Sequence, residues 1–108
     1  MTGENRFVMA SYLVTGTSRG LGLAMVTHLA TSSDIEVVFA GARSQTPQLE
    51  KLVAQSAGKI VYIEMDTIDQ NSVDQAVVTV QEYLGNRGLD YLVNNAGIGG
   101  FAPGWTEE

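Results

Sequence analysis

The sequence predicts a three-layer α/β fold, in which one parallel sheet is covered by helices on both faces. The first observation is that short β-branched, apolar runs alternate with longer segments whose apolar residues recur at helical spacing, in the order β-α-β-α-β-α-β. The second is that the strand runs are almost continuously apolar, which is typical of strands buried on both faces. Because crossovers between parallel strands are right-handed, the expected spatial order of the strands is 3-2-1-4.

Four short runs are the expected strands. Phe7–Thr15 is followed at once by a glycine, and Glu36–Ala42 is apolar after its first residue. Lys59–Met65 and Leu89–Asn94 have the same β-branched and apolar character. The last run lies at an edge of the predicted sheet, and an uncovered apolar edge favours association.

Three segments between these runs have the apolar spacing of helices. The second segment opens at Pro47, where the missing N–H of proline does no harm. The residues that mark the three helices are Leu21, Ala24, Met25 and Leu29, then Leu49, Leu52 and Val53, then Val73, Ala76, Val77, Val80 and Leu84. The glycine-rich stretch 98–108 is expected to be a loop, with or without fixed structure.

Length and composition fit one domain. The chain has 108 residues, enough for a core but not for a nucleotide domain and a separate substrate domain. Twelve acidic and six basic residues give a net charge of −6, which disfavours nucleic acid and anionic membranes as partners. The absence of cysteine excludes disulfides, thiolate metal sites and a cysteine nucleophile. Without a recognisable signal peptide or membrane span, a cytoplasmic location is expected.

The connection between the first strand and the first helix contains Gly16, Gly20 and Gly22. Glycines suit such a turn because they permit the tight bend, the approach of a pyrophosphate to the backbone and close packing of helix on sheet. The N-terminus of the following helix then offers N–H groups and a partial positive charge to the phosphates. The spacing Gly-x-x-x-Gly-x-Gly differs from the usual dinucleotide fingerprint, and no P-loop is present. Taken by itself, the turn is also compatible with a tight connection that binds nothing.

Residues 15–22 (TGTSRGLG) resemble the cofactor signature of the short-chain dehydrogenases/reductases. Residues 94–97 (NNAG) resemble the second signature of that family, and Asp66 matches its adenine-ring aspartate. The three markers occur in the family's order, each at the end of a predicted strand. The resemblance covers nearly the whole chain but only the N-terminal part of the family's Rossmann-type fold. It implies that residues 1–108 are a partial, truncated dinucleotide-binding domain.

By this resemblance, the NNAG segment lies along the cofactor riboses and Asp66 contacts the adenine ring. Two alternatives stay open, which are a ligand-free turn for NNAG and a cap or turn role for Asp66, as expected for Asp69 and Asp74. The full set of expected cofactor-binding residues is Gly16, Thr17, Ser18, Arg19, Gly20, Leu21, Gly22, Ala42, Arg43, Ser44, Asp66, Thr67, Asn95, Ala96 and Gly97.

The residues after the second strand favour NADP(H) over NAD(H). An acidic residue about 20 positions beyond the glycines usually binds the ribose 2′-hydroxyl of NAD. At that distance from Gly22 this chain has Ala42, followed by Arg43. A carboxylate would repel a 2′-phosphate, whereas an arginine binds it with a forked contact. Arg19 is a second cation within reach, and Ser44 adds a hydroxyl.

Catalytic residues of the family are not assignable in this chain. The family uses a tyrosine as general acid/base, a lysine four residues later and a serine upstream. Tyr91 is followed four residues later by Asn95, and the remaining tyrosines lie in the nucleotide-binding part. The single histidine, His28, is expected at the surface, and the acidic residues of segment 64–69 are not expected to bind a metal.

The leading hypothesis is that the parent protein is an NADP(H)-dependent carbonyl reductase or alcohol dehydrogenase with a small-molecule carbonyl or alcohol substrate. This chain would be its cofactor-binding half, inactive alone, and the full-length family member is expected to form a homo-oligomer. Two alternatives remain. One is a non-catalytic NADP(H)-binding or regulatory module, and the other is an interaction protein that uses its exposed sheet edge.

Overall fold

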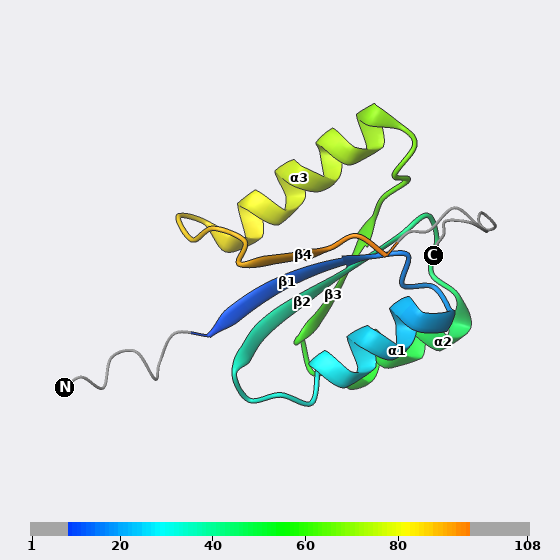
Figure 1. Cartoon of the computed structure of the whole chain (residues 1–108), viewed down its shortest axis with the longest axis vertical. Coiled ribbons are helices and arrows are strands. Elements are labelled where there is room, and N and C mark those ends of the chain that lie inside the picture. Colours follow the sequence, from blue (N-terminus) through cyan, green and yellow to red (C-terminus); the bar gives the residue numbers. More distant parts are fainter. Residues whose placement is uncertain (1–8, 96–108) are drawn as a thin grey trace, which may run out of the picture.

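The computed structural model describes residues 9–95, which form four strands and three helices (Figure 1). The elements are β1 (Ala10–Thr15), α1 (Gly20–Leu29), β2 (Ile35–Ala42), α2 (Pro47–Gln55), β3 (Ile60–Glu64), α3 (Gln70–Leu84) and β4 (Tyr91–Val93). All neighbouring strands are parallel, in the order β3-β2-β1-β4. The predicted fold class, element order and strand order are therefore confirmed.

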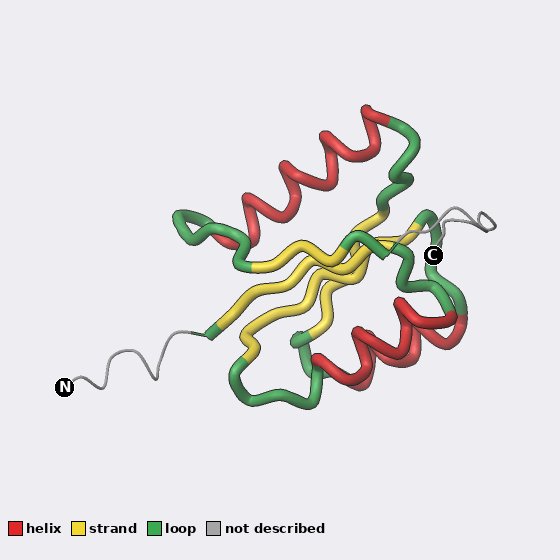
Figure 2. Tube along the Cα trace, in the orientation of Figure 1, coloured by secondary structure: helices red, strands yellow, loops and turns green. Residues whose placement is uncertain are grey.

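The sheet is the middle layer of three. Helices α1 and α2 lie side by side on one face, and α3 lies on the other (Figures 1 and 2). Residues that alternate along the central strands belong to two separate apolar clusters, because successive side chains of a strand point to opposite faces. Leu13 and Phe39 pack in the cluster with α3, whereas Val14 and Val38 pack in the cluster with α1 and α2. No helix within residues 9–95 is long and apolar enough to cross a membrane.

The fourth strand is shorter than predicted. Leu89–Asn94 was the expected range, but β4 pairs with β1 only from Tyr91 to Val93. Before β4, a side chain replaces the backbone hydrogen bond that a longer strand would make, since Oδ2 of Asp90 accepts a hydrogen bond from the N–H of Ser11 at 2.8 Å. After it, the chain turns toward the end of β1 and the N–H of Asn95 donates to a side-chain oxygen. Strand β3 is one residue shorter at each end than the predicted Lys59–Met65, and β2 begins one residue before the predicted Glu36. Phe7 and Val8 of the first predicted strand lie outside the described residues.

The buried faces of two helices differ from the predicted stripes. Helix α1 starts at Gly20, and its buried residues are Gly22 and Val26. Leu21 is 68% exposed, Val77 on α3 is 43% exposed and Ala24 is exposed as well, so these three positions of the predicted stripes are wrong as core residues. The rotation of α1 follows from the close approach of Gly22 to the preceding turn, which is a tertiary contact that periodicity alone does not register.

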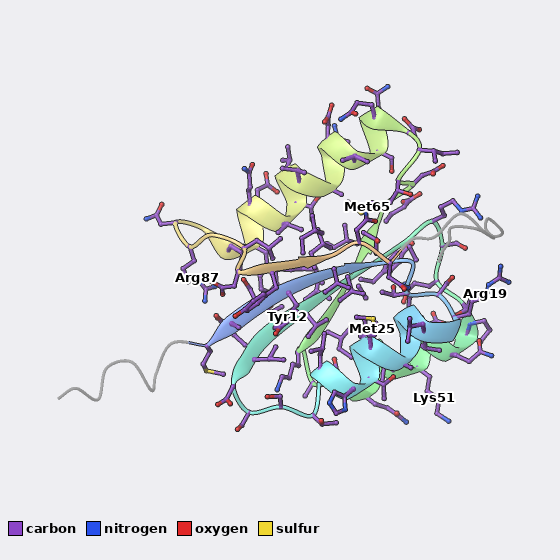
Figure 3. The ribbon with its side chains drawn as sticks, in the orientation of Figure 1. Tyr12, Arg19, Met25, Lys51, Met65 and Arg87 are labelled. Atoms are coloured by element: carbon purple, nitrogen blue, oxygen red, sulfur yellow. The ribbon has the colours of Figure 1, made fainter. Side chains whose placement is uncertain are left out.

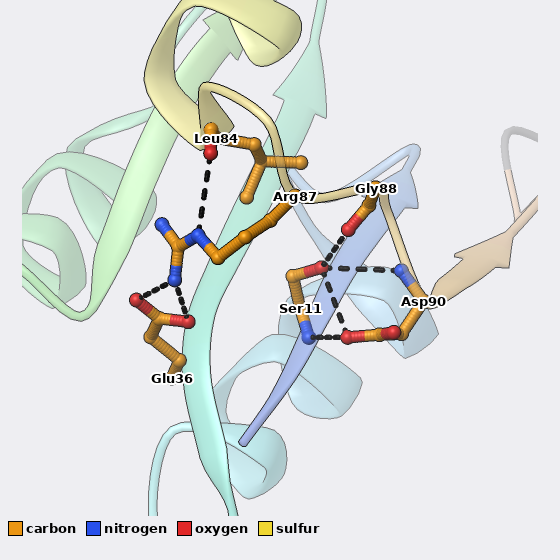
Figure 4. A network of polar contacts seen from close by, with 6 residues as sticks. All are labelled: Ser11, Glu36, Leu84, Arg87, Gly88 and Asp90. Carbon is orange, nitrogen blue, oxygen red and sulfur yellow. Dashed lines mark hydrogen bonds and ion pairs between the residues drawn. The ribbon is translucent and has the colours of Figure 1, made fainter. Parts of the chain in front are cut away.

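An ion pair connects the α3–β4 connection to β2 at the amino ends of the strands (Figure 4). Arg87 pairs with Glu36, and its Nε donates to the carbonyl of Leu84 at 3.2 Å. The hydrogen bond to Glu36 raises the pKa of the Arg87 guanidinium. This pair and the Ser11–Asp90 contact lie beside each other and hold the start of β4 against the sheet.

Candidate functional site

The expected cofactor residues that the structure describes come from the carboxyl ends of the strands. From β1 the chain passes through α1 to β2 on one face of the sheet, whereas α3 leads to β4 on the other face (Figure 1). The carboxyl end of β1 is thus the point at which the strand order reverses. Open α/β sheets place their ligand crevice at such a point, and the glycine turn lies there.

Three glycines shape this turn in different ways. Gly16 and Gly20 have φ values of 69° and 62°, a left-handed backbone that favours glycine. At Gly22, an added Cβ would lie 2.0 Å from the carbonyl oxygen of Gly16 and 2.6 Å from Nδ2 of Asn95. Helix α1 therefore approaches the turn so closely that only glycine fits at this position, as the sequence analysis predicted for one of the three.

The N-cap residue of α1 makes no side-chain capping hydrogen bond. Arg19 is its N-cap residue in an extended conformation, and no acidic residue occupies the first turn. In contrast, α2 is capped by Thr46 and α3 by Asp69. The first N–H groups of a helix lack acceptors within the helix. The first turn of α1 therefore offers hydrogen-bond donors and the positive end of the helix dipole to an anion.

Three hydrogen bonds attach the turn to the end of β2 and the segment that follows it. Thr17 is fully buried, and both its N–H and its hydroxyl donate to the carbonyl of Gly41 at 3.1 Å. The carbonyl of Ser18 accepts a hydrogen bond from the hydroxyl of Thr46 at 2.7 Å. Because Thr17 is fully buried and both its donors are engaged inside the protein, its expected contribution to the cofactor site reduces to the shape of the turn.

The two arginines proposed for cofactor selection lie on the segments that these bonds join. Arg19, Arg43 and Ser44 are exposed, and Arg19 extends outward beside the start of α1 (Figure 3). Ala42 is buried, and its carbonyl accepts hydrogen bonds from the hydroxyl of Tyr62 at 3.0 Å and the N–H of Met65 at 2.9 Å. Strand β2 itself thus ends in an alanine, whose register partner on β3 is Glu64.

The second signature contacts the first. The N–H of Asn95 donates to Oγ1 of Thr15 at 2.8 Å, and its Nδ2 donates to the carbonyl of Gly16 at 3.3 Å. The Thr15 hydroxyl also lies 3.2 Å from Oδ1 of Asn94. The two motifs, which are about 80 residues apart in sequence, are thus joined by hydrogen bonds. Ala96, Gly97 and the loop expected at 98–108 lie outside the described residues.

Asp66 has a turn role in the structure. Its Oδ1 accepts a hydrogen bond from the N–H of Ile68 at 3.2 Å, and its own N–H donates to the hydroxyl of Ser72 at 2.8 Å. These bonds fix the β3–α3 loop, in which Asp66 is half-buried and Thr67 is exposed. The turn alternative for Asp66 is therefore realised, and the adenine role expected from the resemblance is not tested by this arrangement.

The other acidic residues and the histidine are placed as follows. Asp69 caps α3 by accepting from the N–H groups of Asn71 and Ser72, as predicted. Asp74 does not cap, because it lies inside α3 and accepts from Nε2 of Gln70. His28 is exposed in the last turn of α1. Among residues 9–95 no three histidine, aspartate or glutamate side chains are grouped as metal ligands.

Two groups at the site were missed from the sequence. The capping role of Thr46 could have been predicted, since a threonine immediately before a proline at a helix start is typical of an N-cap. No sequence pattern indicates its hydrogen bond to Ser18. Tyr62 had no signal, because its hydroxyl reaches Ala42 across two neighbouring strands. Burial and then the negative charge of Glu64 raise the pKa of Tyr62 above its ordinary value, so its hydroxyl remains a donor to that carbonyl.

Comparisons with known proteins agree with the fold and the motifs. The family model described as short chain dehydrogenase matches residues 10–106. Short chain dehydrogenase pigC of Monascus ruber is 39% identical over 92 residues, which are 79% of this chain and 29% of that protein. Norsolorinic acid ketoreductase of Aspergillus parasiticus is 30% identical over 98 residues, which are 88% of this chain and 36% of that protein.

Solved structures are similar over the same region. The NADPH-bound carbonyl reductase from chicken fatty liver has a TM-score of 0.76 and 37% identity, covering 83% of this chain and 37% of that one. The carbonyl reductase Sniffer of D. melanogaster has a TM-score of 0.75 and 32% identity, with the same coverage. The chain thus spans about a third of the length of these relatives.

Proposed function

Because the chain belongs to the short-chain dehydrogenase family, an oxidoreductase family, we propose that it is the NADP(H)-binding part of a carbonyl reductase or alcohol dehydrogenase. The substrate class is a small-molecule carbonyl or alcohol, and residues 1–108 are a partial dinucleotide-binding domain. The proposed activity is inferred from the family, since the chain spans only about a third of the relatives' length. The remaining support comes from the residues of the glycine turn and of the end of β2.

The glycine turn has the properties that a dinucleotide requires. The uncapped start of α1 offers N–H donors to a pyrophosphate. Gly22 leaves no side chain between α1 and the turn, and Asn95 holds the carbonyl of Gly16 in place. The residues expected to line the cofactor from this side are therefore Gly16, Ser18, Gly20, Leu21 and Gly22, while the buried Thr17 belongs to the set by fixing the shape of the turn. Asp66, Thr67, Asn95, Ala96 and Gly97 complete the proposed set.

The observation that carries the choice of NADP(H) is the pair of exposed arginines, Arg19 and Arg43, beside a β2 end that has Ala42 instead of a carboxylate. Guanidinium groups bind phosphate oxygens with forked, charge-assisted hydrogen bonds. Ser44 is exposed next to Arg43 and adds a hydroxyl donor. The chicken carbonyl reductase, a structural neighbour at 37% identity, is NADPH-bound.

A nicotinamide cofactor bound at this turn would supply the hydride chemistry. The residues of this chain bind and orient the cofactor, and they do not transfer a proton to the substrate. Arg19 and Arg43 would neutralise the 2′-phosphate of NADP(H), while the N–H groups at the start of α1 would donate hydrogen bonds to its pyrophosphate. Thr17 and Thr46 keep the turn in position through their bonds to Gly41 and Ser18.

The proposal is tested by the variant Arg43→Ala in the intact protein. Its affinity for NADPH is expected to fall about tenfold, the value of one charge-assisted contact, while its affinity for NADH stays unchanged. Isothermal titration calorimetry with both cofactors measures the two dissociation constants. Lys51→Ala is the matched control, because Lys51 is an exposed cation on α2 that is not in the proposed set.

Two results would contradict the proposal. If Arg43→Ala and wild type showed the same ratio of NADPH to NADH affinity, Arg43 would not select the cofactor. If the intact protein bound NADPH but reduced no carbonyl and oxidised no alcohol, the non-catalytic binding module would replace the enzyme as the better description.

A further inference from the structure

Thr46 joins two segments that are 28 residues apart in sequence. Its hydroxyl donates to the carbonyl of Ser18 at 2.7 Å, and the same oxygen accepts from the N–H of Leu49 at 3.3 Å. The second bond is the N-cap of α2 and belongs to the helix. The first bond is not required by the cap, since an N-cap oxygen only has to accept. It is therefore a separate connection between α2 and the glycine turn.

The segments joined by this bond carry the two exposed arginines. Arg19 follows Ser18 directly, and Arg43 lies three residues before Thr46. We propose that Thr46 is a positioning residue for the 2′-phosphate of NADPH, which holds Arg19 and Arg43 at a fixed separation through its bond to Ser18. This inference rests on the cofactor proposed above and deepens it, because it assigns part of the NADPH preference to a residue that does not itself bind the phosphate.

The bond is expected to affect NADPH more than NADH because the rest of the turn has its own attachments. Thr17 is tied to Gly41 by two hydrogen bonds. The carbonyl of Gly16 is held by Asn95 and packs against Gly22. Loss of the Thr46 bond would therefore release Ser18 and the adjacent Arg19, while the part of the turn proposed to face the pyrophosphate stays in place.

The test uses the intact protein with Thr46→Val, which removes the hydroxyl, and Thr46→Ser, which keeps it. Thr46→Gly is a second variant without a hydroxyl, since glycine is nearly as good an N-cap as threonine and protects the fold of α2. Thr79→Val is the matched control, because the Thr79 hydroxyl also donates to a backbone carbonyl, that of Gln75, but on α3. Dissociation constants for NADPH and NADH are measured for each variant by calorimetry, with thermal unfolding recorded alongside.

The expected result is a loss of about fivefold in NADPH affinity for Thr46→Val and Thr46→Gly, with NADH affinity changed less than about twofold. Thr46→Ser and Thr79→Val should bind both cofactors as wild type does. An equal loss for both cofactors would overturn the inference, because Thr46 would then be only structural. Unchanged affinities in both hydroxyl-free variants would overturn it as well.

Failure of the underlying proposal has a different signature. If wild type bound NADH as tightly as NADPH, the cofactor assignment would fall, and the role of Thr46 in phosphate selection would fall with it. If wild type preferred NADPH and the Thr46→Val variant kept that preference, the cofactor assignment would stand and only the role of Thr46 would be refuted.

Discussion

Gly22 is the residue at which one added methyl group would disturb the proposed site most directly. A Cβ there would lie 2.0 Å from the carbonyl oxygen of Gly16, far inside contact distance. The nearest atoms belong to the backbone of Gly16, which cannot rotate away as a side chain could, so the turn or α1 would have to move. Gly22 thus links a sequence motif to a packing requirement, and through it to the binding surface.

The variant Gly22→Ala is expected to lower the free energy of unfolding by about 2 kcal/mol or more, as other overpacked positions do. Urea denaturation followed by circular dichroism measures this loss. Gly88→Ala is the control, because an added Cβ at Gly88 meets no atom within 4 Å, and its effect should stay within about 0.5 kcal/mol. Equal stabilities of the two variants would show that α1 does not pack on the turn as described.

At the scale of elements, β4 is held to the sheet at both of its ends by side chains. Asp90 accepts the N–H of Ser11 before the strand, and Asn95 donates to Thr15 after it. Between them only three residue pairs connect β4 to β1. A strand this short depends on its end contacts, and the second of these contacts also brings the NNAG segment to the glycine turn.

Asp90→Ala is expected to destabilise the fold by about 1–3 kcal/mol, because it leaves the buried N–H of Ser11 without its acceptor. Hydrogen exchange of the Ser11 amide should accelerate together with the loss in denaturation midpoint. In Asp74→Ala, by comparison, only an exposed contact within α3 is lost, worth about 0.5 kcal/mol or less. Unchanged Ser11 protection in Asp90→Ala would contradict the described contact.

For the molecule as a whole, the notable surface is the sheet edge formed by β4, where apolar side chains are exposed. Tyr91 and Leu92 on β4 are 54% and 62% exposed, and Val77 and Val78 on the neighbouring layer are exposed as well. In the relatives, about two thirds of the length lies outside the region that this chain matches. The edge at β4 is therefore an apolar surface in the described residues, as the sequence predicted for its fourth strand.

The polypeptide of residues 1–108, expressed alone, is expected to self-associate through this edge. Leu92→Glu should shift it toward monomer in analytical ultracentrifugation, because a charge replaces an exposed apolar side chain. Thr27→Glu introduces the same charge on the exposed side of α1 and should leave association unchanged. Equal association of both variants would mean that another surface is responsible, or that net charge alone controls it.

The sequence by itself determined the α/β class, the strand order 3-2-1-4, the glycine turn and the family. The elements and the glycine turn follow from local properties, which are hydrophobic periodicity and the steric freedom of glycine, and the strand order follows from the general rule that crossovers are right-handed. Only the tertiary structure decided that Gly22 and Val26, not Leu21, face the core, and that both donors of Thr17 are engaged. It alone joined Thr46 to Ser18 and Asn95 to Thr15. These contacts connect residues 28 and 80 positions apart, and such partners are chosen by the packing of helices on the sheet, which no local pattern in the sequence records.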